Sequence, residues 1–258
     1  MNLSNVSPRT LTGRALRYLA YHAVPPGLRV PILRGPARGK RWLAGAHCPA
    51  CWLGCYEYDK QQILEREVHP GSVVFDVGAH RGFFTLVASS LTGPEGRVIS
   101  FEPLPLNQRY LHQHLRLNHA GNVTVIEAAV SDTCGTARFH DGSEYNPKCI
   151  SAHLATDGEV EVKTVTLDSV IASGQAPAPD VLKIDVEGAE MLVLRGAQRL
   201  LETAGPTLVI DTHGRPAHEE CCAFLAARGY QPRTSGEEIY VLDDGTERYF
   251  GELFAKKD

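Results

Sequence analysis

Residues 73–82 read Val-Val-Phe-Asp-Val-Gly-Ala-His-Arg-Gly, and this stretch decides the fold of the 258-residue chain. An apolar run around Asp76 leads to Gly78 and Gly82, which have three residues between them, and a helix-like apolar stretch follows from Phe83. A buried strand, a tight glycine turn and a helix start form the opening unit of a nucleotide-binding α/β sheet. We expect Gly78 to permit the sharp turn and Gly82 to let the helix sit close to a bound ligand.

Asp76 indicates which ligand this turn receives. Dinucleotide-binding folds place a pyrophosphate here and carry G-x-G-x-x-G, whereas this chain has G-A-H-R-G after a carboxylate. A carboxylate repels a pyrophosphate but suits a cationic ligand without phosphate, such as S-adenosylmethionine with its sulfonium and ammonium groups. The alternative is an ordinary strand–turn–helix connection whose acid is merely exposed.

Glu102 ends the next strand, close to the spacing at which an acid binds the ribose in dinucleotide folds. A ribose diol donates two hydrogen bonds, and a carboxylate accepts both. The alternative is an acid that favours the start of the following helix. Further along, Ala128 and Ala129 are small enough for an adenine to lie against the backbone.

Strand and helix patterns alternate along the rest of the chain, which predicts a doubly wound, Rossmann-like α/β sheet with polar residues gathered at the carboxyl ends of its strands. Residues 134–165 are expected to form a β-rich, irregular insertion. Strands are expected at 97–103, 122–132, 159–165, 180–190, 207–213 and 239–242, and helices at 11–23, 56–68, 107–118, 191–201 and 219–228.

Composition narrows the class of protein. The formal net charge of −4 gives no reason to expect nucleic acid as a partner, and no apolar run approaches the ~20 residues of a membrane span. No secretory signal pattern is present, and seven cysteines, an odd number, indicate reduced thiols in the cytoplasm. A homo-oligomer remains possible.

Residues 1–56 contain no Asp or Glu but several Arg and Lys residues, so we expect a basic lid or lead-in segment before a catalytic domain at 57–258. The alternatives are a helix that lies on an anionic membrane and a targeting address. Within the segment, His47, Cys48, Cys51 and Cys55 invite a zinc interpretation. Structural zinc sites usually have two separated ligand pairs, and no second pair follows, so the cysteines are expected to be small apolar residues near a turn.

Three motifs in order resemble the FkbM family of class I S-adenosylmethionine-dependent methyltransferases: D-V-G-A-H-R-G from Asp76, F-E-P from Phe101, and K-I-D-V-E-G-A-E from Lys183. The resemblance covers roughly residues 50–215. It implies a seven-stranded sheet whose last strand is antiparallel, and O-methylation of a small-molecule hydroxyl on a natural product, sugar or lipid. It also implies cofactor-binding residues: Asp76, Gly78, Ala79 and Gly82 at the methionyl end, Glu102 at the ribose, and Ser131 or Asp132 at the adenine edge.

Methyl transfer to a hydroxyl requires alignment, exclusion of water and removal of the hydroxyl proton. The candidates are Asp185 after one strand, and Asp211 and His213 on the next. Together they resemble the Mg²⁺ site of catechol-type O-methyltransferases. The alternative, which we favour, is a metal-free general base at His213 oriented by Asp185 or Asp211. Glu187 and Glu190 are further candidates, although acids are common in a first helical turn.

Other classes of function stay open at this point. One is an S-adenosylmethionine-binding fold without catalysis that serves as an interaction module. A nicotinamide oxidoreductase is disfavoured by the missing G-x-G-x-x-G motif. Methylation of a macromolecule is disfavoured because I-D-V-E-G replaces the strand-end motif expected of amino methyltransferases.

Overall fold

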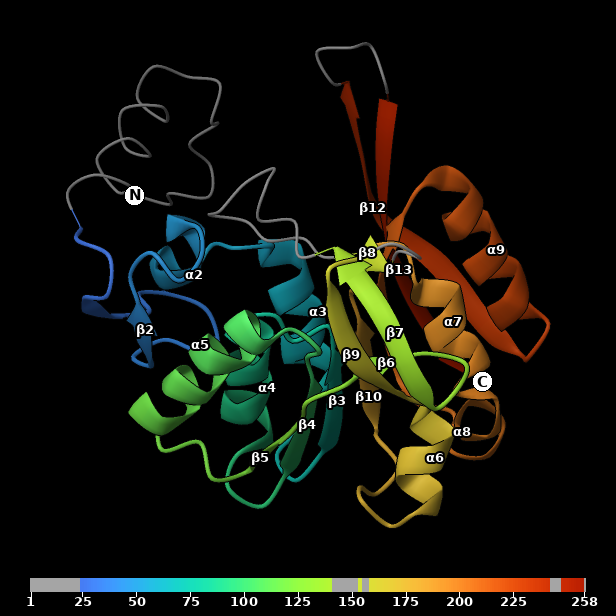
Figure 1. Cartoon of the computed structure of the whole chain (residues 1–258), viewed down its shortest axis with the longest axis horizontal. Helices are drawn as coiled ribbons and strands as arrows, with labels where there is room; N and C mark the ends of the chain where they lie inside the picture. Colours follow the sequence, from blue (N-terminus) through green and yellow to red (C-terminus); the bar gives the residue numbers. More distant parts are fainter. Residues whose placement is uncertain (1–23, 141–152, 155–157, 242–246, 258) are drawn as a thin grey trace.

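The computed structural model describes residues 24–140, 153–154, 158–241 and 247–257, so the helix expected at 11–23 lies outside the described residues. A seven-stranded sheet, in the order β12-β13-β11-β10-β3-β4-β5, forms the centre of the fold (Figure 1). Five neighbouring strands of this sheet, β5, β4, β3, β10 and β11, are parallel, and β13 is antiparallel to its neighbours β11 and β12. The sheet consists of β3 (Val73–Val77), β4 (Arg97–Phe101), β5 (Val123–Ile126), β10 (Val181–Ile184), β11 (Thr207–His213), β12 (Tyr230–Val241) and β13 (Glu247–Lys257).

Helices cover both faces of this sheet because its central strands are apolar on both sides (Figure 1). Val74 of β3 joins one core, with residues of α2, α3 and α4, while Phe75 and Val77 join the other, with residues of α6, α7, α8 and α9. The helices are α2 (Pro49–Leu53), α3 (Tyr58–Glu67), α4 (Phe83–Thr92), α5 (Pro105–Leu117), α6 (Leu167–Ala172), α7 (Glu190–Arg195), α8 (Gln198–Thr203) and α9 (Arg215–Ala226). No helix among the described residues is long and apolar enough to cross a membrane.

A second sheet corrects the single strand expected at 122–132. The chain leaves the large sheet after Ile126, and Ala129 pairs with Thr164 instead. The small sheet has the order β6-β9-β7-β8 and lies over the carboxyl ends of the large one. Its strands are β6 (Ala129–Val130), β7 (Gly135–His140), β8 (His153–Leu154) and β9 (Val160–Val165), so the described part of the expected insertion is indeed rich in β-structure.

Two further elements differ from expectation. The helix expected at 191–201 is divided into α7 and α8 around Gly196, where a Cβ atom would lie 2.0 Å from the Ser131 carbonyl oxygen. The described part of the short strand expected at 239–242 is the end of β12, which forms a long hairpin with β13. The described side chains from Arg233 to Ile239 are exposed, so no apolar alternation marks this strand in the sequence.

The described part of the lead-in segment packs against the domain. β1 (Arg29–Pro31) and β2 (Arg41–Leu43) form a hairpin that places Trp42 in the core, fully buried. The Trp42 ring stacks on His114 of α5 with centroids 3.8 Å apart. The Leu43 N–H donates to His114 Nε2 (3.1 Å), and Asn118 exchanges two hydrogen bonds with the Arg41 backbone. The boundary expected at residue 56 stays a prediction.

Replacement of Trp42 tests how strongly this hairpin is joined to the domain. Trp42→Ala should lower the free energy of unfolding by about 3–5 kcal/mol, because it removes a buried indole and leaves a cavity. Urea denaturation measures the change. Leu28→Ala, at a position 51% exposed, is the matched control and should change stability by less than about 0.5 kcal/mol. Equal stabilities of the two variants would show that the hairpin contributes nothing to the core.

Candidate active site

A cavity lies at the carboxyl ends of β3, β4 and β10, the position at which open α/β sheets bind ligands. Gly78 lines it after β3, Glu102 after β4, and Asp185 and Glu187 after β10. Apolar residues of both sheets complete the wall: Val77, Phe101, Ala128, Ala129, Val130 and Phe139. The cavity therefore combines an apolar wall, which includes the expected Ala128 and Ala129, with a few carboxylates.

The glycine turn after β3 is shaped by close contacts within the protein. Gly78 has φ of 76°, and a Cβ atom there would lie 1.8 Å from the Asp185 carbonyl oxygen. Only glycine allows this approach between β3 and β10. Gly82 has φ of 89° and begins α4, but a Cβ atom there would meet Leu111 of α5. Gly82 thus serves helix packing, and neither it nor Ala79 is among the residues that line the cavity.

Asp76 faces the protein interior. Its side chain is almost fully buried, with Oδ1 2.9 Å from Lys183 Nζ, and Oδ2 accepts a hydrogen bond from Thr85 Oγ1 (2.6 Å). Lys183 Nζ also donates to the Gly78 carbonyl oxygen (3.2 Å). Asp76 is therefore connected to the glycine turn through Lys183, and it does not line the cavity. Direct contact between Asp76 and a cofactor stays a prediction.

Glu102 is held rigidly at the cavity wall. Its Oε2 accepts from the His80 N–H (2.7 Å), and its Oε1 accepts from the Leu104 N–H (3.0 Å) and from Asn107 Nδ2 (3.2 Å). A carboxylate has about four acceptor positions, so capacity remains for a ligand hydroxyl. Burial raises the pKa of Glu102 to about 7, despite these hydrogen bonds, which favour the ionised form.

The residues expected at the adenine edge lie away from the cavity. Ser131 is buried, and its N–H donates to the Val165 carbonyl oxygen (2.9 Å), while Asp132 is exposed. Neither residue is among those that line the cavity. Ala128, Ala129 and Val130, which directly precede them, do line the cavity. Contact of Ser131 or Asp132 with an adenine stays a prediction.

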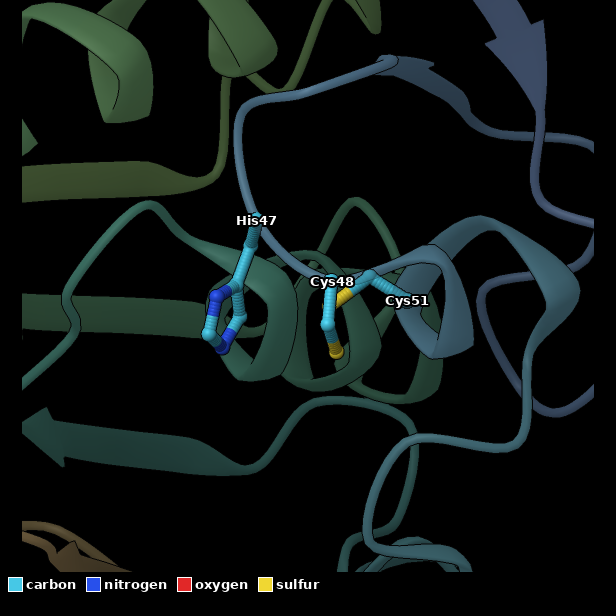
Figure 2. Close-up of side chains that lie close together, drawn as sticks. All are labelled: His47, Cys48 and Cys51. Carbon is cyan, nitrogen blue, oxygen red and sulfur yellow. The ribbon is translucent and has the colours of Figure 1, made fainter. Parts of the chain in front are cut away.

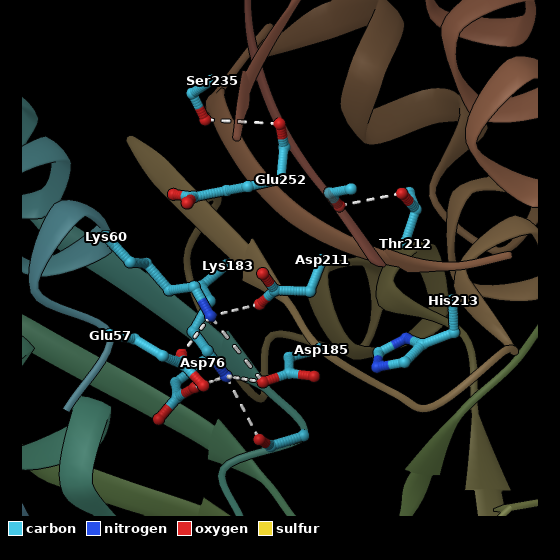
Figure 3. Close-up of polar contacts among 12 residues, drawn as sticks. Glu57, Lys60, Asp76, Lys183, Asp185, Asp211, Thr212, His213, Ser235 and Glu252 are labelled. Atoms are coloured by element: carbon cyan, nitrogen blue, oxygen red, sulfur yellow. Dashed lines mark hydrogen bonds and ion pairs between the residues drawn. The ribbon is translucent and has the colours of Figure 1, made fainter. Parts of the chain in front are cut away.

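Two buried lysines gather the acids at the strand ends (Figure 3). Lys60 of α3 contacts both Glu57 and Asp211, and its Nζ lies 4.0 Å from Asp185 Oδ2. Lys183 of β10 lies 3.9 Å from the same Asp185 oxygen. Burial raises the pKa of Asp185, but the charges of Lys183 and Lys60 outweigh it and lower the pKa to about 2, so Asp185 is ionised at neutral pH.

Asp211 has a different environment from Asp185. Its burial raises the pKa to about 7, although the charge of Lys60 acts in the opposite direction. Burial alone would lower the pKa of Lys60, but Asp211, Glu57 and Asp185 together hold it well above its usual range. Lys60 is therefore a charged ammonium group surrounded by carboxylates.

His213 at the end of β11 is held between two other acids. Its Nδ1 lies 2.7 Å from Glu190 Oε1, and its Nε2 lies 3.2 Å from Glu187 Oε2. Burial acts to lower its pKa, but the hydrogen bond to Glu190 and the charges of Glu187 and Asp185 raise it to about 9. His213 is therefore protonated at neutral pH, and Glu190 and Glu187 hold it, not the expected Asp185 or Asp211.

The expected metal ligands Asp185, Asp211 and His213 fall into two groups. Asp185 and Asp211 lie with Glu57, and Asp185 and His213 lie with Glu187, the ligand atoms of each group within 4.8 Å of one another. The first group already surrounds the ammonium of Lys60. The Lys60 ammonium thus occupies the place where the expected Mg²⁺ would have been attracted. The second group consists of two carboxylates and an imidazole and has no lysine among its members.

The sequence-based predictions gave no role to Lys60 or Lys183, although the sequence contains a signal for Lys183. Lys183 lies within an apolar strand, and a buried ammonium requires a carboxylate partner. In the parallel register of β10 and β3, Lys183 is opposite Asp76. Lys60 gave no such signal, because its partners come from three separate parts of the chain.

The order of the large sheet, its antiparallel last strand and the cavity at its carboxyl edge define the fold of class I methyltransferases. The family model of the methyltransferase FkbM domain matches residues 76–232. The chain therefore belongs to the FkbM methyltransferase domain family, and the expectation of an S-adenosylmethionine-dependent methyltransferase domain is confirmed.

Two curated relatives are similar over most of the chain. The 31-O-demethyl-FK506 methyltransferase FkbM of Streptomyces tacrolimicus is 34% identical over 214 residues, which cover 68% of this chain and 81% of that protein. The hexuronic acid methyltransferase AglP of Haloferax volcanii is 29% identical over 161 residues, which cover 61% of this chain and 62% of that protein. Among solved structures, a methyltransferase FkbM from Methylobacillus flagellatus matches with a TM-score of 0.49 and 16% identity, covering 93% of this chain and 60% of that one.

The pKa of Glu102 gives a test of its expected role at the ribose. Only the ionised carboxylate can accept from both ribose hydroxyls, so affinity for S-adenosylmethionine should fall as the pH is lowered through about 7. From pH 8 to pH 6 we expect a loss of roughly tenfold, measured by titration calorimetry. Glu102→Gln should bind more weakly at pH 8 and lose this pH dependence. The exposed Glu95→Gln is the control, and a pH dependence that persists in Glu102→Gln would contradict the assignment.

Proposed function

We propose that this protein is an S-adenosylmethionine-dependent O-methyltransferase that acts on a hydroxyl group of a small molecule. The observation that carries the proposal is the cavity itself, which combines a buried carboxylate after β4, two carboxylates after β10 and an apolar wall. Both curated relatives are small-molecule methyltransferases, one for a hexuronic acid and the other for 31-O-demethyl-FK506. The chain spans 62% of the Haloferax relative, so its own acceptor is part of the proposal.

The polar, apolar and charged groups that line the cavity fit S-adenosylmethionine. Glu102 supplies acceptors for a ribose diol, and Ala128, Ala129 and Val130 supply a flat apolar wall for an adenine. Gly78 itself lines the cavity with these groups. Asp185, ionised at neutral pH, favours the positive charges of the methionyl end. When bound, the cofactor supplies an electrophilic methyl group on its sulfonium.

The acceptor hydroxyl must lose its proton as its oxygen bonds to the methyl carbon and the carbon–sulfur bond breaks. We assign acceptance of its hydrogen bond, and then of the proton, to the Glu187 carboxylate that lines the cavity, because Asp185, with a pKa of about 2, is a weak base. A protonated His213 cannot accept a proton, so we assign it a positioning role, in which it holds Glu187 through Nε2. This role replaces the general base expected from the sequence.

The contacts of Lys60 favour chemistry without a metal among the acids around it. Its ammonium is in contact with Glu57 and Asp211 and already neutralises part of their charge. Asp185, Glu187 and His213 offer ligand atoms that Mg²⁺ can bind, so the assay also tests whether turnover depends on Mg²⁺. Retention of turnover in the presence of a chelator is expected.

The proposed function is tested with S-adenosylmethionine that carries a labelled methyl group. The full chain should transfer the label to the oxygen of hydroxylated small molecules, with sugar acids and macrolide hydroxyls as the first acceptors to assay. Cofactor binding without transfer to any acceptor would favour a non-catalytic module, and transfer to protein or nucleic acid alone would favour methylation of a macromolecule.

Removal of His213 distinguishes a positioning residue from a general base. His213→Ala should keep cofactor affinity within about twofold and lower turnover by roughly 10²-fold, because Glu187 loses its partner. In the wild type, turnover should be level between pH 7 and pH 8 and fall as His213 loses its proton near pH 9. Turnover that instead rises toward pH 9 would identify His213 as the base. His119→Ala, at an exposed position outside the cavity, is the control.

A further inference from the structure

Among the described residues, one further group of ligating side chains lies outside the strand-end acids, in the lead-in segment (Figure 2). The ligand atoms of His47, Cys48 and Cys51 all lie within 4.8 Å of one another. These three residues come from a stretch of only five positions. The absence of a second ligand pair in the sequence argued against zinc, but the fold brings three of the four candidate ligands within reach of one ion.

Local backbone structure explains why the three side chains meet. Cys48 has an extended backbone immediately before α2, and Pro49 occupies the first turn of that helix, where its fixed φ is favourable. The Cys51 N–H donates to the Cys48 carbonyl oxygen (3.2 Å), which closes one turn. Residues three positions apart at the start of a helix point the same way, so both thiols lie on one side.

The chemistry of the group matches a soft divalent ion. An imidazole and two thiolates are a ligand set of zinc, and the three protein ligands leave one coordination position for water or a substrate atom. Cys51 is fully buried and belongs to the core that contains Trp42 and Ala46, while Cys48 and His47 are half-buried. Both cysteines are free thiols. Two thiolates at such depth need a compensating positive charge, which the metal provides.

We propose that His47, Cys48 and Cys51 bind a single zinc ion at the edge of the methyl-donor cavity. The site belongs to this edge because His47 also lines the cavity, where its ring lies 4.9 Å from that of His80. All three ligands belong to the lead-in segment, so a bound ion would fix the part of that segment that borders the cavity. The proposal stands independently of the identity of the methyl acceptor.

Metal analysis of the reduced, full-length protein tests the site. After incubation with zinc and exhaustive dialysis, the wild type should retain about one zinc ion per chain, and Cys48→Ser and His47→Ala should each lose at least roughly tenfold in zinc affinity. Cys134→Ser, which removes an exposed cysteine outside the group, should bind as the wild type does. Circular dichroism of each variant separates loss of a ligand from loss of folding.

A second measurement uses Co²⁺ in place of zinc. The wild type should show a thiolate-to-cobalt absorption band that is lost in Cys48→Ser and kept in Cys134→Ser. Zinc content that is the same in the wild type, Cys48→Ser and His47→Ala would overturn the proposal. So would a reduced wild-type protein that binds no zinc and readily forms a Cys48–Cys51 disulfide.

Discussion

The buried ion pair between Asp76 and Lys183 is the constraint on which the rest of this site depends. Neither charge could be buried alone, because an isolated ammonium or carboxylate in a protein core is strongly unfavourable. The pair joins β3 to β10 in register, and the second hydrogen bond from Lys183 fixes the Gly78 carbonyl. The carboxyl ends of the two central strands are thereby held together at the place where the cavity opens.

Further ion pairs connect this pair to the acids at the strand ends, where the chemistry is proposed. Lys183 and Lys60 keep Asp185 ionised, and Lys60 connects Asp185 and Asp211 to Glu57 at the start of α3. The acids at the strand ends have distinct protonation behaviour, with the pKa of Asp185 at about 2 and those of Asp211 and Glu102 at about 7. Separation of this kind lets neighbouring carboxylates take different roles.

The sequence predicted the sheet well because its signals are local. The apolar strand before Gly78 and the acids at Glu102 and Asp185 each lie where a strand ends, and strand ends meet at one edge of a parallel sheet. The direction of a side chain is not a local property. The burial of Asp76 toward Lys183, the approach of Lys60 from α3 and the pairing of His213 with Glu190 depend on tertiary packing. The sequence therefore indicated other partners for Asp76 and His213 and no role for Lys60.

A crystal structure of the protein with S-adenosylhomocysteine is the most direct test of this account. We predict adenosine against Ala128–Val130, both ribose hydroxyls within hydrogen-bond distance of Glu102, and an intact pair between Asp76 and Lys183. Adenosine bound elsewhere would contradict the account. So would an Asp76 carboxylate that has left Lys183 to contact the ligand.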